Sequence, residues 1–232
     1  MNAQDPQVGG PLSGVRIADF SRVLAGPYAT MLLADLGADV IKIEGPEGDG
    51  TRQWTPPANA VGQSTYYAGA NRGKRSVVCD LRDPAGLAVA AELAHSADVV
   101  IQNFKPGTME RFGLGYEAVT EQNPGVVYCS ISGFGDAEGA ELPGYDLLVQ
   151  AVGGLMSITG QTEGEPTKVG VALVDIITGL NAVIGIQAAL RARDDEASPV
   201  HGQGQHVRVN LLSSLLSALA NQASSTLETG VS

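Results

Sequence analysis

The sequence predicts an α/β protein in which helices cover both faces of a mostly parallel sheet. Three observations predict this class. Short apolar, β-branched segments alternate with segments of helical periodicity, as they do when helices connect parallel strands. The first elements follow the order strand, turn, helix, glycine, strand, which is a βαβ unit. The composition, 44% apolar with 30 glycines, is typical of an enzyme that is rich in loops.

Each element has a local reason. Apolar runs between turn residues predict strands at residues 15–20, 40–44, 76–80, 98–102, 126–132 and 206–210. Pro27 in a first turn and Gly37 after a last turn delimit a helix at residues 26–36. Asp83 is the expected N-cap of a helix that runs to His95. Further helices are expected at residues 114–121, at 143–153, after Asp175 and at 211–227.

Residues 45–73 are expected to form a long irregular stretch, which contains one tryptophan and two tyrosines. Loops of this length in compact domains are usually functional or disordered. The aromatic rings offer flat apolar faces to a ligand, and a packed surface loop is the alternative interpretation.

Composition argues against several classes of function. The net charge of −11 argues against a nucleic acid partner. No window approaches 18 consecutive apolar residues, so no membrane span is expected. Cys79 and Cys129 lie in apolar runs, which indicates reduced core thiols and a cytoplasmic protein. Residues 1–10 are polar and are expected to be a flexible N-terminus rather than a secretory signal.

Common catalytic motifs do not occur in the sequence. The turn after the first strand fits neither G-x-G-x-x-G nor a P-loop, and G-x-S-x-G is not found. Histidine, cysteine and acidic residues do not show the spacing of metal ligands, so no metal is expected. Carboxylates near the middle of the chain, chiefly Asp146 and Asp175, remain as candidates for covalent or acid–base chemistry.

Asp175 is the single carboxylate in the apolar run at residues 170–179, between two glycines. A short strand or loop is expected to lead into a helix at this point. Two interpretations are open. Asp175 is either the N-cap of that helix, or a nucleophilic or basic carboxylate in a dry pocket, supported by the helix dipole.

The basic residues are concentrated in the first half of the chain. Residues 1–111 carry ten Lys and Arg against twelve acids, a net charge of −2, whereas residues 112–232 carry four against thirteen, a net charge of −9. An anionic small molecule is therefore expected to bind the first half, beyond the carboxyl ends of the parallel strands. Arg22, Arg82, Asn103 and Lys105 occupy turns at such ends. Each base alone is equally consistent with ordinary solvated surface.

Several motifs, in order, resemble those of the family III (CaiB/BaiF) CoA-transferases. They lie at residues 11–27, 36–44 (LGADVIKIE), 71–76 (NRGKRS), 103–107 (NFKPG), 144–146 (GYD) and 170–179. The resemblance covers residues 11 to about 230 and implies a Rossmann-like fold, the large domain of such an enzyme. Residues 50–54 (GTRQW) and 64–67 (STYY) are most similar to members that use succinyl-CoA and dicarboxylic acids.

The resemblance also implies roles for individual residues. The catalytic aspartate of the family falls on Asp175, with Tyr145 and Asp146 as further catalytic candidates. The implied CoA-binding positions are Leu24, Ala25, Cys79, Asp80, Leu81, Arg82, Asn103, Phe104, Lys105, Arg111, Pro143 and Gly144. Gly45 stands where some members use an arginine, which leaves that contact open.

The implied reaction is transfer of CoA from an acyl-CoA donor, succinyl-CoA above all, to a carboxylic acid. It proceeds through an aspartyl-acyl anhydride and an aspartyl-CoA thioester, without a prosthetic group. One alternative is an α-methylacyl-CoA racemase, although such members use a histidine where this chain has Tyr145. Another is a CoA-binding fragment that is inactive without a downstream part.

Family chains are longer, have a second, smaller domain and form interlocked dimers. By this resemblance, residues 11–205 are expected to form the CoA-binding and catalytic α/β domain. Residues 206–232 are expected to lead toward a second domain, and the full-length form is expected to be a homodimer.

Overall fold

The computed structural model describes residues 9–161 and 164–231, so residues 1–8 of the expected flexible N-terminus lie outside the described residues. Six strands form one sheet in the order β3-β2-β1-β4-β5-β6. They are β1 (Arg16–Asp19), β2 (Asp39–Glu44), β3 (Lys74–Val78), β4 (Val99–Gln102), β5 (Val127–Ser132) and β6 (His206–Asn210). Every neighbouring pair is parallel, which confirms the predicted α/β class.

Helices lie on both faces of this sheet, as predicted. The α-helices are α1 (Ala25–Asp35), α2 (Thr65–Asn71), α3 (Pro84–His95), α4 (Thr108–Arg111), α5 (Tyr116–Gln122), α6 (Asp146–Val152), α7 (Leu173–Asp194) and α8 (Leu211–Thr229). Side chains of alternate strand residues point to opposite faces. Ile17 and Val99 pack in the core under α1 and α7, while Ala18 and Val100 pack in the core under α3 and α5.

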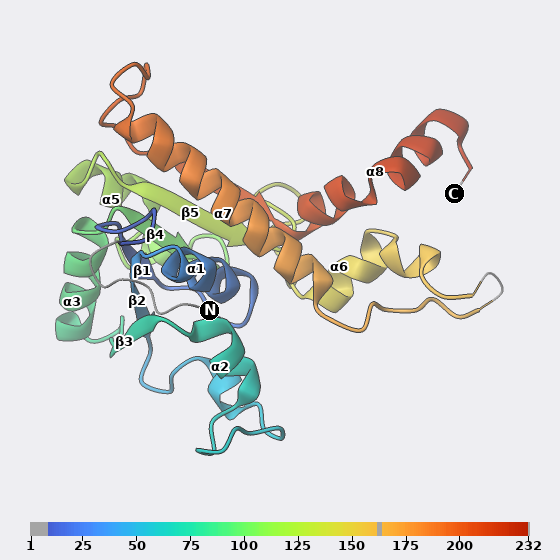
Figure 1. Ribbon diagram of the computed structural model, residues 1–232, viewed down its shortest axis with the longest axis horizontal. Coiled ribbons are helices and arrows are strands. Elements are labelled where there is room, and N and C mark those ends of the chain that lie inside the picture. The colour runs from blue at the N-terminus through green and yellow to red at the C-terminus, as the bar shows by residue number, and fades with distance from the viewer. Residues whose placement is uncertain (1–8, 162–163, 232) are drawn as a thin grey trace.

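Helix α7 carries Asp175 and lies next to α1 on the sheet (Figure 1). By length and composition it is apolar enough to cross a membrane, with a mean hydropathy of 1.7, although polar residues interrupt its apolar run. Much of this hydropathy belongs to core residues, since Ala182 and Ile186 are fully buried. Gly179 allows the close approach of α1, because a Cβ there would lie 2.7 Å from the Ala25 carbonyl oxygen.

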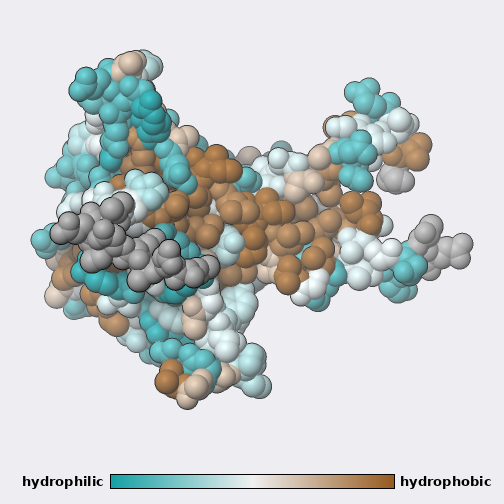
Figure 2. All heavy atoms as spheres, in the orientation of Figure 1, coloured by the Kyte–Doolittle hydropathy of each residue, from teal (hydrophilic) through white to brown (hydrophobic). Residues whose placement is uncertain are grey.

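Apolar side chains are also exposed beyond the sheet. Hydrophobic residues gather over α7 and toward α6 and α8, which extend away from the sheet (Figures 1 and 2). Exposed members include Val152, Leu180, Ile184 and Leu216. Helix α8 is kinked at Ala220, where φ is 41°.

Two local predictions are wrong, and one short helix was not predicted. Residues 45–73 are not irregular throughout, because the Asp49 side chain caps the 3-10 helix η1 (Gly50–Gln53) and Ser64 caps α2. Strand β3 begins at Lys74, two residues earlier than predicted, and ends before Cys79, because it pairs with β2 from Lys74 opposite Val40 to Val78 opposite Glu44. The short helix α4 was not predicted; it follows Gly107, whose φ of 79° makes the turn.

Strand β6 pairs with β5 along the edge of the sheet, from Tyr128 opposite His206 to Ser132 opposite Asn210. It therefore belongs to the same sheet as the strands before residue 205. That residues 206–232 lead toward a second domain stays a prediction.

Candidate active site

The strand order reverses between β1 and β4, and ligands of open α/β sheets bind beyond the carboxyl ends of strands at such a point. Asn103, just after β4, joins the turns that leave these two strands. Its Oδ1 accepts the Arg22 N–H at 2.8 Å, and its Nδ2 donates to the Arg22 carbonyl oxygen at 2.7 Å. The Arg22 guanidinium stacks over the Phe104 ring, 4.3 Å from the ring centre. These residues separate two cavities.

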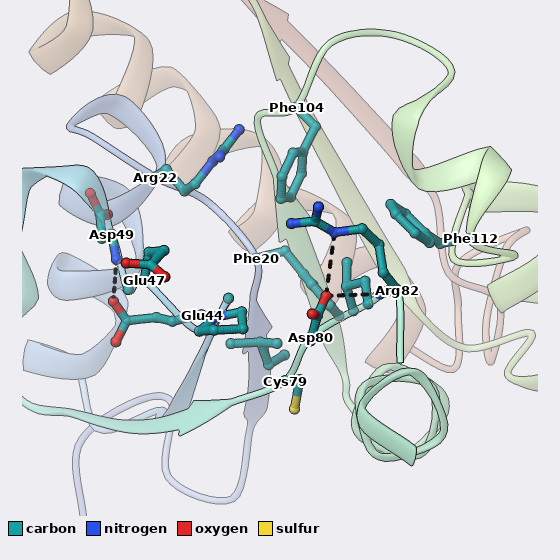
Figure 3. Close-up of a pocket in the computed structure, with 15 residues that line it drawn as sticks. Phe20, Arg22, Glu44, Glu47, Asp49, Cys79, Asp80, Arg82, Phe104 and Phe112 are labelled. Atoms are coloured by element: carbon teal, nitrogen blue, oxygen red, sulfur yellow. Dashed lines mark hydrogen bonds and ion pairs between the residues drawn. The ribbon is translucent and has the colours of Figure 1, made fainter. Parts of the chain in front are cut away.

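The first, here called the aromatic cavity, has a volume of about 300 Å³ (Figure 3). It brings together predicted CoA-binding residues from two turns, namely Cys79, Asp80, Leu81, Arg82 and Phe104. Phe20 and Phe112 add two more rings. Arg22 and Arg82 supply positive charge, and Glu44, Glu47, Asp49 and Asp80 supply negative charge. Gly45 also lines this cavity and offers no side chain to a ligand. Burial raises the pKa of the Cys79 thiol, which disfavours a reactive thiolate there.

The second cavity, here called the Asp175 pocket, has a volume of about 490 Å³. It collects predicted residues from four separate segments: Leu24, Ala25, Asn103, Phe104, Lys105, Pro143, Gly144, Tyr145 and Asp175. Arg22 and Phe104 line both cavities, so the two are neighbours. Arg111 was predicted as a CoA contact, but it lines neither cavity, and its guanidinium donates to Thr108 Oγ1 at 3.3 Å.

The position of Asp175 excludes the N-cap interpretation. Helix α7 begins at Leu173 with Ala172 as its N-cap, so Asp175 is the third helical residue. Asp146 accepts the N–H groups that have no partner within the helix: its Oδ2 accepts from the N–H of Val174 at 2.7 Å and from that of Asp175 at 3.1 Å. Because another carboxylate satisfies the helix start, the Asp175 side chain is free to line the pocket.

The electrostatics of the pocket favour a reactive carboxylate. Burial above all, and the charge of Asp146, raise the pKa of Asp175 from 3.8 to about 7. The charges of Asp175 and Asp146 also affect the pKa of Tyr66. Burial and then Asp175 and Asp146 raise the pKa of its hydroxyl to about 12, and its ring packs edge-to-face on Trp54 with the ring centres 4.9 Å apart. The sequence marked both aromatic residues as ligand-facing candidates, but it did not bring them near Asp175.

A comparison with protein families shows the family of the chain. The model of CoA-transferase family III matches residues 12–232. The chain belongs to CoA-transferase family III. The α/β sheet and its flanking helices are therefore those of a family III domain.

Relatives of this family III chain agree with the match. The succinate–glutarate CoA-transferase of Agrobacterium fabrum is 48% identical over 91% of this chain and 54% of its own length. The succinyl-CoA:mesaconate CoA-transferase of Haloarcula hispanica is 45% identical over 90% of this chain and 53% of its own. A CaiB/BaiF family crystal structure from Brucella suis has 45% identity and a TM-score of 0.90, covering 97% of this chain and 59% of that one. The chain spans about half the length of the curated relatives it matches.

Asp175→Asn is expected to stabilise the family III domain at pH 8 and to have little effect at pH 4. The pKa of Asp175 is about 7 in the folded protein and 3.8 in an unperturbed chain, so the native protein binds this proton more tightly than the unfolded chain does. Asp175 therefore stabilises the fold below pH 3.8, and this contribution is lost as the pH rises through about 7. The gain at pH 8 is at most about 4 kcal/mol.

Denaturant unfolding of both proteins between pH 4 and pH 8 measures this difference. Asp194→Asn, an exposed carboxylate at the far end of α7, is the control. Parallel pH dependences for wild type and Asp175→Asn would show that the carboxyl at position 175 does not titrate near neutrality.

Proposed function

We propose that this chain is the CoA-binding and catalytic part of a CoA-transferase that moves CoA from succinyl-CoA to a carboxylic acid. One observation carries the proposal. A half-buried carboxylate with a raised pKa, Asp175, lines a pocket that adjoins a cavity whose walls carry phenylalanine rings and both basic and acidic side chains. The names of its relatives, which specify succinate, glutarate and mesaconate, support dicarboxylic acids as the substrate class.

The two cavities suit the two ends of an acyl-CoA. Phe104 and Phe112 offer ring faces to a purine, and Arg22 offers a cation to phosphate groups, whereas Arg82 lies 3.5 Å from the carboxylate of Asp80. The pantetheine arm would pass Asn103, which joins the two turns, and bring the thioester to Asp175.

In the proposed reaction, an Asp175 carboxylate oxygen attacks the thioester carbonyl carbon of the donor. The C–S bond breaks, CoA leaves as the thiolate, and an aspartyl-acyl anhydride remains. The thiolate then attacks the aspartyl carbonyl carbon, which releases the donor acid and forms an aspartyl-CoA thioester. The acceptor carboxylate displaces the thiolate to form a second anhydride. Attack of the thiolate on the acyl carbonyl of the acceptor gives the new acyl-CoA and restores Asp175.

A pKa of about 7 suits this role. Only the ionised carboxylate is a nucleophile, and it is substantially populated at neutral pH. Its basicity is higher than that of an exposed aspartate, which strengthens it as a nucleophile. Asp146 contributes by satisfying the N–H groups at the start of α7 and by raising this pKa.

A panel of carboxylic acids incubated with succinyl-CoA tests the function. Mass spectrometry of the CoA esters is expected to show transfer to dicarboxylic acids such as glutarate and mesaconate, and little to monocarboxylic acids. The assay uses this chain alone and joined to the downstream region of its longer relatives, and light scattering of both reports the expected homodimer. CoA binding without transfer by either form would favour the alternative of a binding fragment.

The racemase alternative predicts a different result. A racemase exchanges the C2 proton of a 2-methylacyl-CoA with heavy water and needs two acid/base groups. At the position where such enzymes have a histidine, this chain presents Tyr145, which is exposed in the Asp175 pocket. We expect no exchange at C2, and exchange at the rate of turnover would overturn the transferase proposal.

A further inference from the structure

Charged side chains are buried beneath the turn that leads from β1 to α1. Two ion pairs lie there, Lys42 with Asp49 and Lys74 with Asp19, each at 3.1 Å. All four side chains are at most 2% exposed. Buried ion pairs add little net stability compared with apolar residues of the same size. Their presence therefore points to a role other than stability.

Three of these charges bind the backbone of the turn itself. The Lys42 Nζ donates to the Ser21 carbonyl oxygen at 2.8 Å. Asp49 Oδ2 accepts the Val23 N–H at 3.2 Å, and Asp19 Oδ1 accepts the Ser21 N–H at 2.9 Å. Hydrogen bonds to charged groups in a buried site are stronger than neutral ones. Hydrogen bonds to charged side chains therefore hold the peptide groups of Ser21 and Val23 in place.

The turn requires such support because its backbone is strained. Val23 has a φ of 69°, in the left-handed region that β-branched residues strongly avoid. Residues on both sides of Val23 line the cavities: Arg22 lines both, and Leu24 and Ala25 line the Asp175 pocket. A relaxed φ at Val23 would redirect the chain at this wall of the site.

We propose that the Lys42–Asp49 ion pair positions the catalytic pocket by holding residues 21–24 in their strained turn. The proposal rests on the proposed function for its catalytic consequence. Lys42 and Asp49 bond the backbone of the turn, and although Asp49 also lines the aromatic cavity, its side chain is 0% exposed, so both are positioning residues. They set where Leu24 and Ala25 lie relative to Asp175.

Asp49 is itself held in place. Its Oδ1 accepts the Thr51 N–H at 3.0 Å and the Thr51 hydroxyl at 2.8 Å, and its own N–H donates to Glu44 Oε1 at 2.8 Å. The pair therefore connects β2 and the segment after it to the turn after β1. Lys74 provides a comparison, because it bonds Asp19, Asn71 and the Pro27 carbonyl oxygen and reaches the backbone of residues 21–24 only through Asp19, which accepts the Ser21 N–H.

The test compares Asp49→Asn with Lys74→Met. Each variant breaks one buried ion pair, so both are expected to lower the unfolding midpoint. Asp49→Asn is expected to increase hydrogen exchange in residues 20–26 more than Lys74→Met does, and to slow acylation of Asp175 by succinyl-CoA more, on the order of tenfold. Val23→Gly added to Asp49→Asn is expected to restore most of the acylation rate, since glycine adopts a positive φ without strain.

Equal effects of both variants, following the loss of stability, would overturn the proposal, as would a failure of Val23→Gly to restore acylation. If Asp49→Asn does not fold, Thr51→Val removes one support of Asp49 and is expected to act in the same direction. If the wild-type protein is not acylated at Asp175, the proposed function fails. Hydrogen exchange in residues 20–26 then still decides whether the ion pair holds the turn.

Discussion

Asp175→Ala is expected to abolish CoA transfer, with a loss of at least about 10³-fold in kcat/KM, and to leave the fold intact. The loss follows because no covalent intermediate forms without the carboxylate. The fold is expected to persist because Asp146, not Asp175, satisfies the N–H groups at the start of α7. Alanine also favours the helical conformation.

Transfer assays and chemical trapping measure this prediction together. Hydroxylamine or borohydride, added after incubation with a thioester substrate, should modify the peptide that contains Asp175 in the wild-type protein only. Asp194→Ala removes an exposed carboxylate from the other end of α7 and serves as the control, with normal transfer expected. An unmodified Asp175 peptide in a working enzyme would remove Asp175 from the mechanism.

Asp146→Ala is expected to lower transfer by about 10²-fold and the free energy of unfolding by about 1–2 kcal/mol. The stability loss arises because the N–H groups of Val174 and Asp175 lose the acceptor at 2.7 and 3.1 Å. Transfer is expected to fall further than the loss of stability alone would cause, because one of these bonds holds the backbone of Asp175. A shift in that backbone moves the attacking oxygen away from the thioester.

Asp146→Asn separates charge from hydrogen bonding. Asparagine keeps a carbonyl oxygen that can accept an N–H but carries no negative charge. Because the charge of Asp146 helps to raise the pKa of Asp175, the acylation rate of this variant is expected to reach half its maximum at a lower pH than in the wild type. The pH profile of acylation is the measurement. An unchanged midpoint would show that the two carboxylates do not interact in the protein that reacts.

The sequence predicted the layers of the fold well because they follow from local patterns. Buried parallel strands appear as continuous apolar runs, and α3 and its cap at Asp83 were predicted correctly. The helix α2 was missed although its cap, Ser64, directly precedes it. The start of β3 at Lys74 was also missed, and the side chain of Lys74 pairs with the carboxylate of Asp19. Such partners are distant in the sequence and become neighbours only in the folded chain.

The candidate site was predicted unevenly for the same reason. Most of the site residues that the family motifs indicated line the two cavities, but the N-cap interpretation of Asp175 competed because the residue precedes an apolar helix. Only the fold shows that Asp146, 29 residues earlier, accepts the N–H of Asp175. Lys42 gave no signal either, since one lysine between two isoleucines is usually a solvated residue of a strand.

The stack of Arg22 on Phe104 forms part of the wall of both cavities. A ligand long enough to occupy the two compartments at once must fit a separation that the folded chain sets in advance. The site therefore selects its ligand partly by the length of the CoA portion, whichever acid is attached to it. Substitutions at Arg22 or Phe104 would therefore change both compartments at once, whereas substitutions at the other lining residues would change one of them.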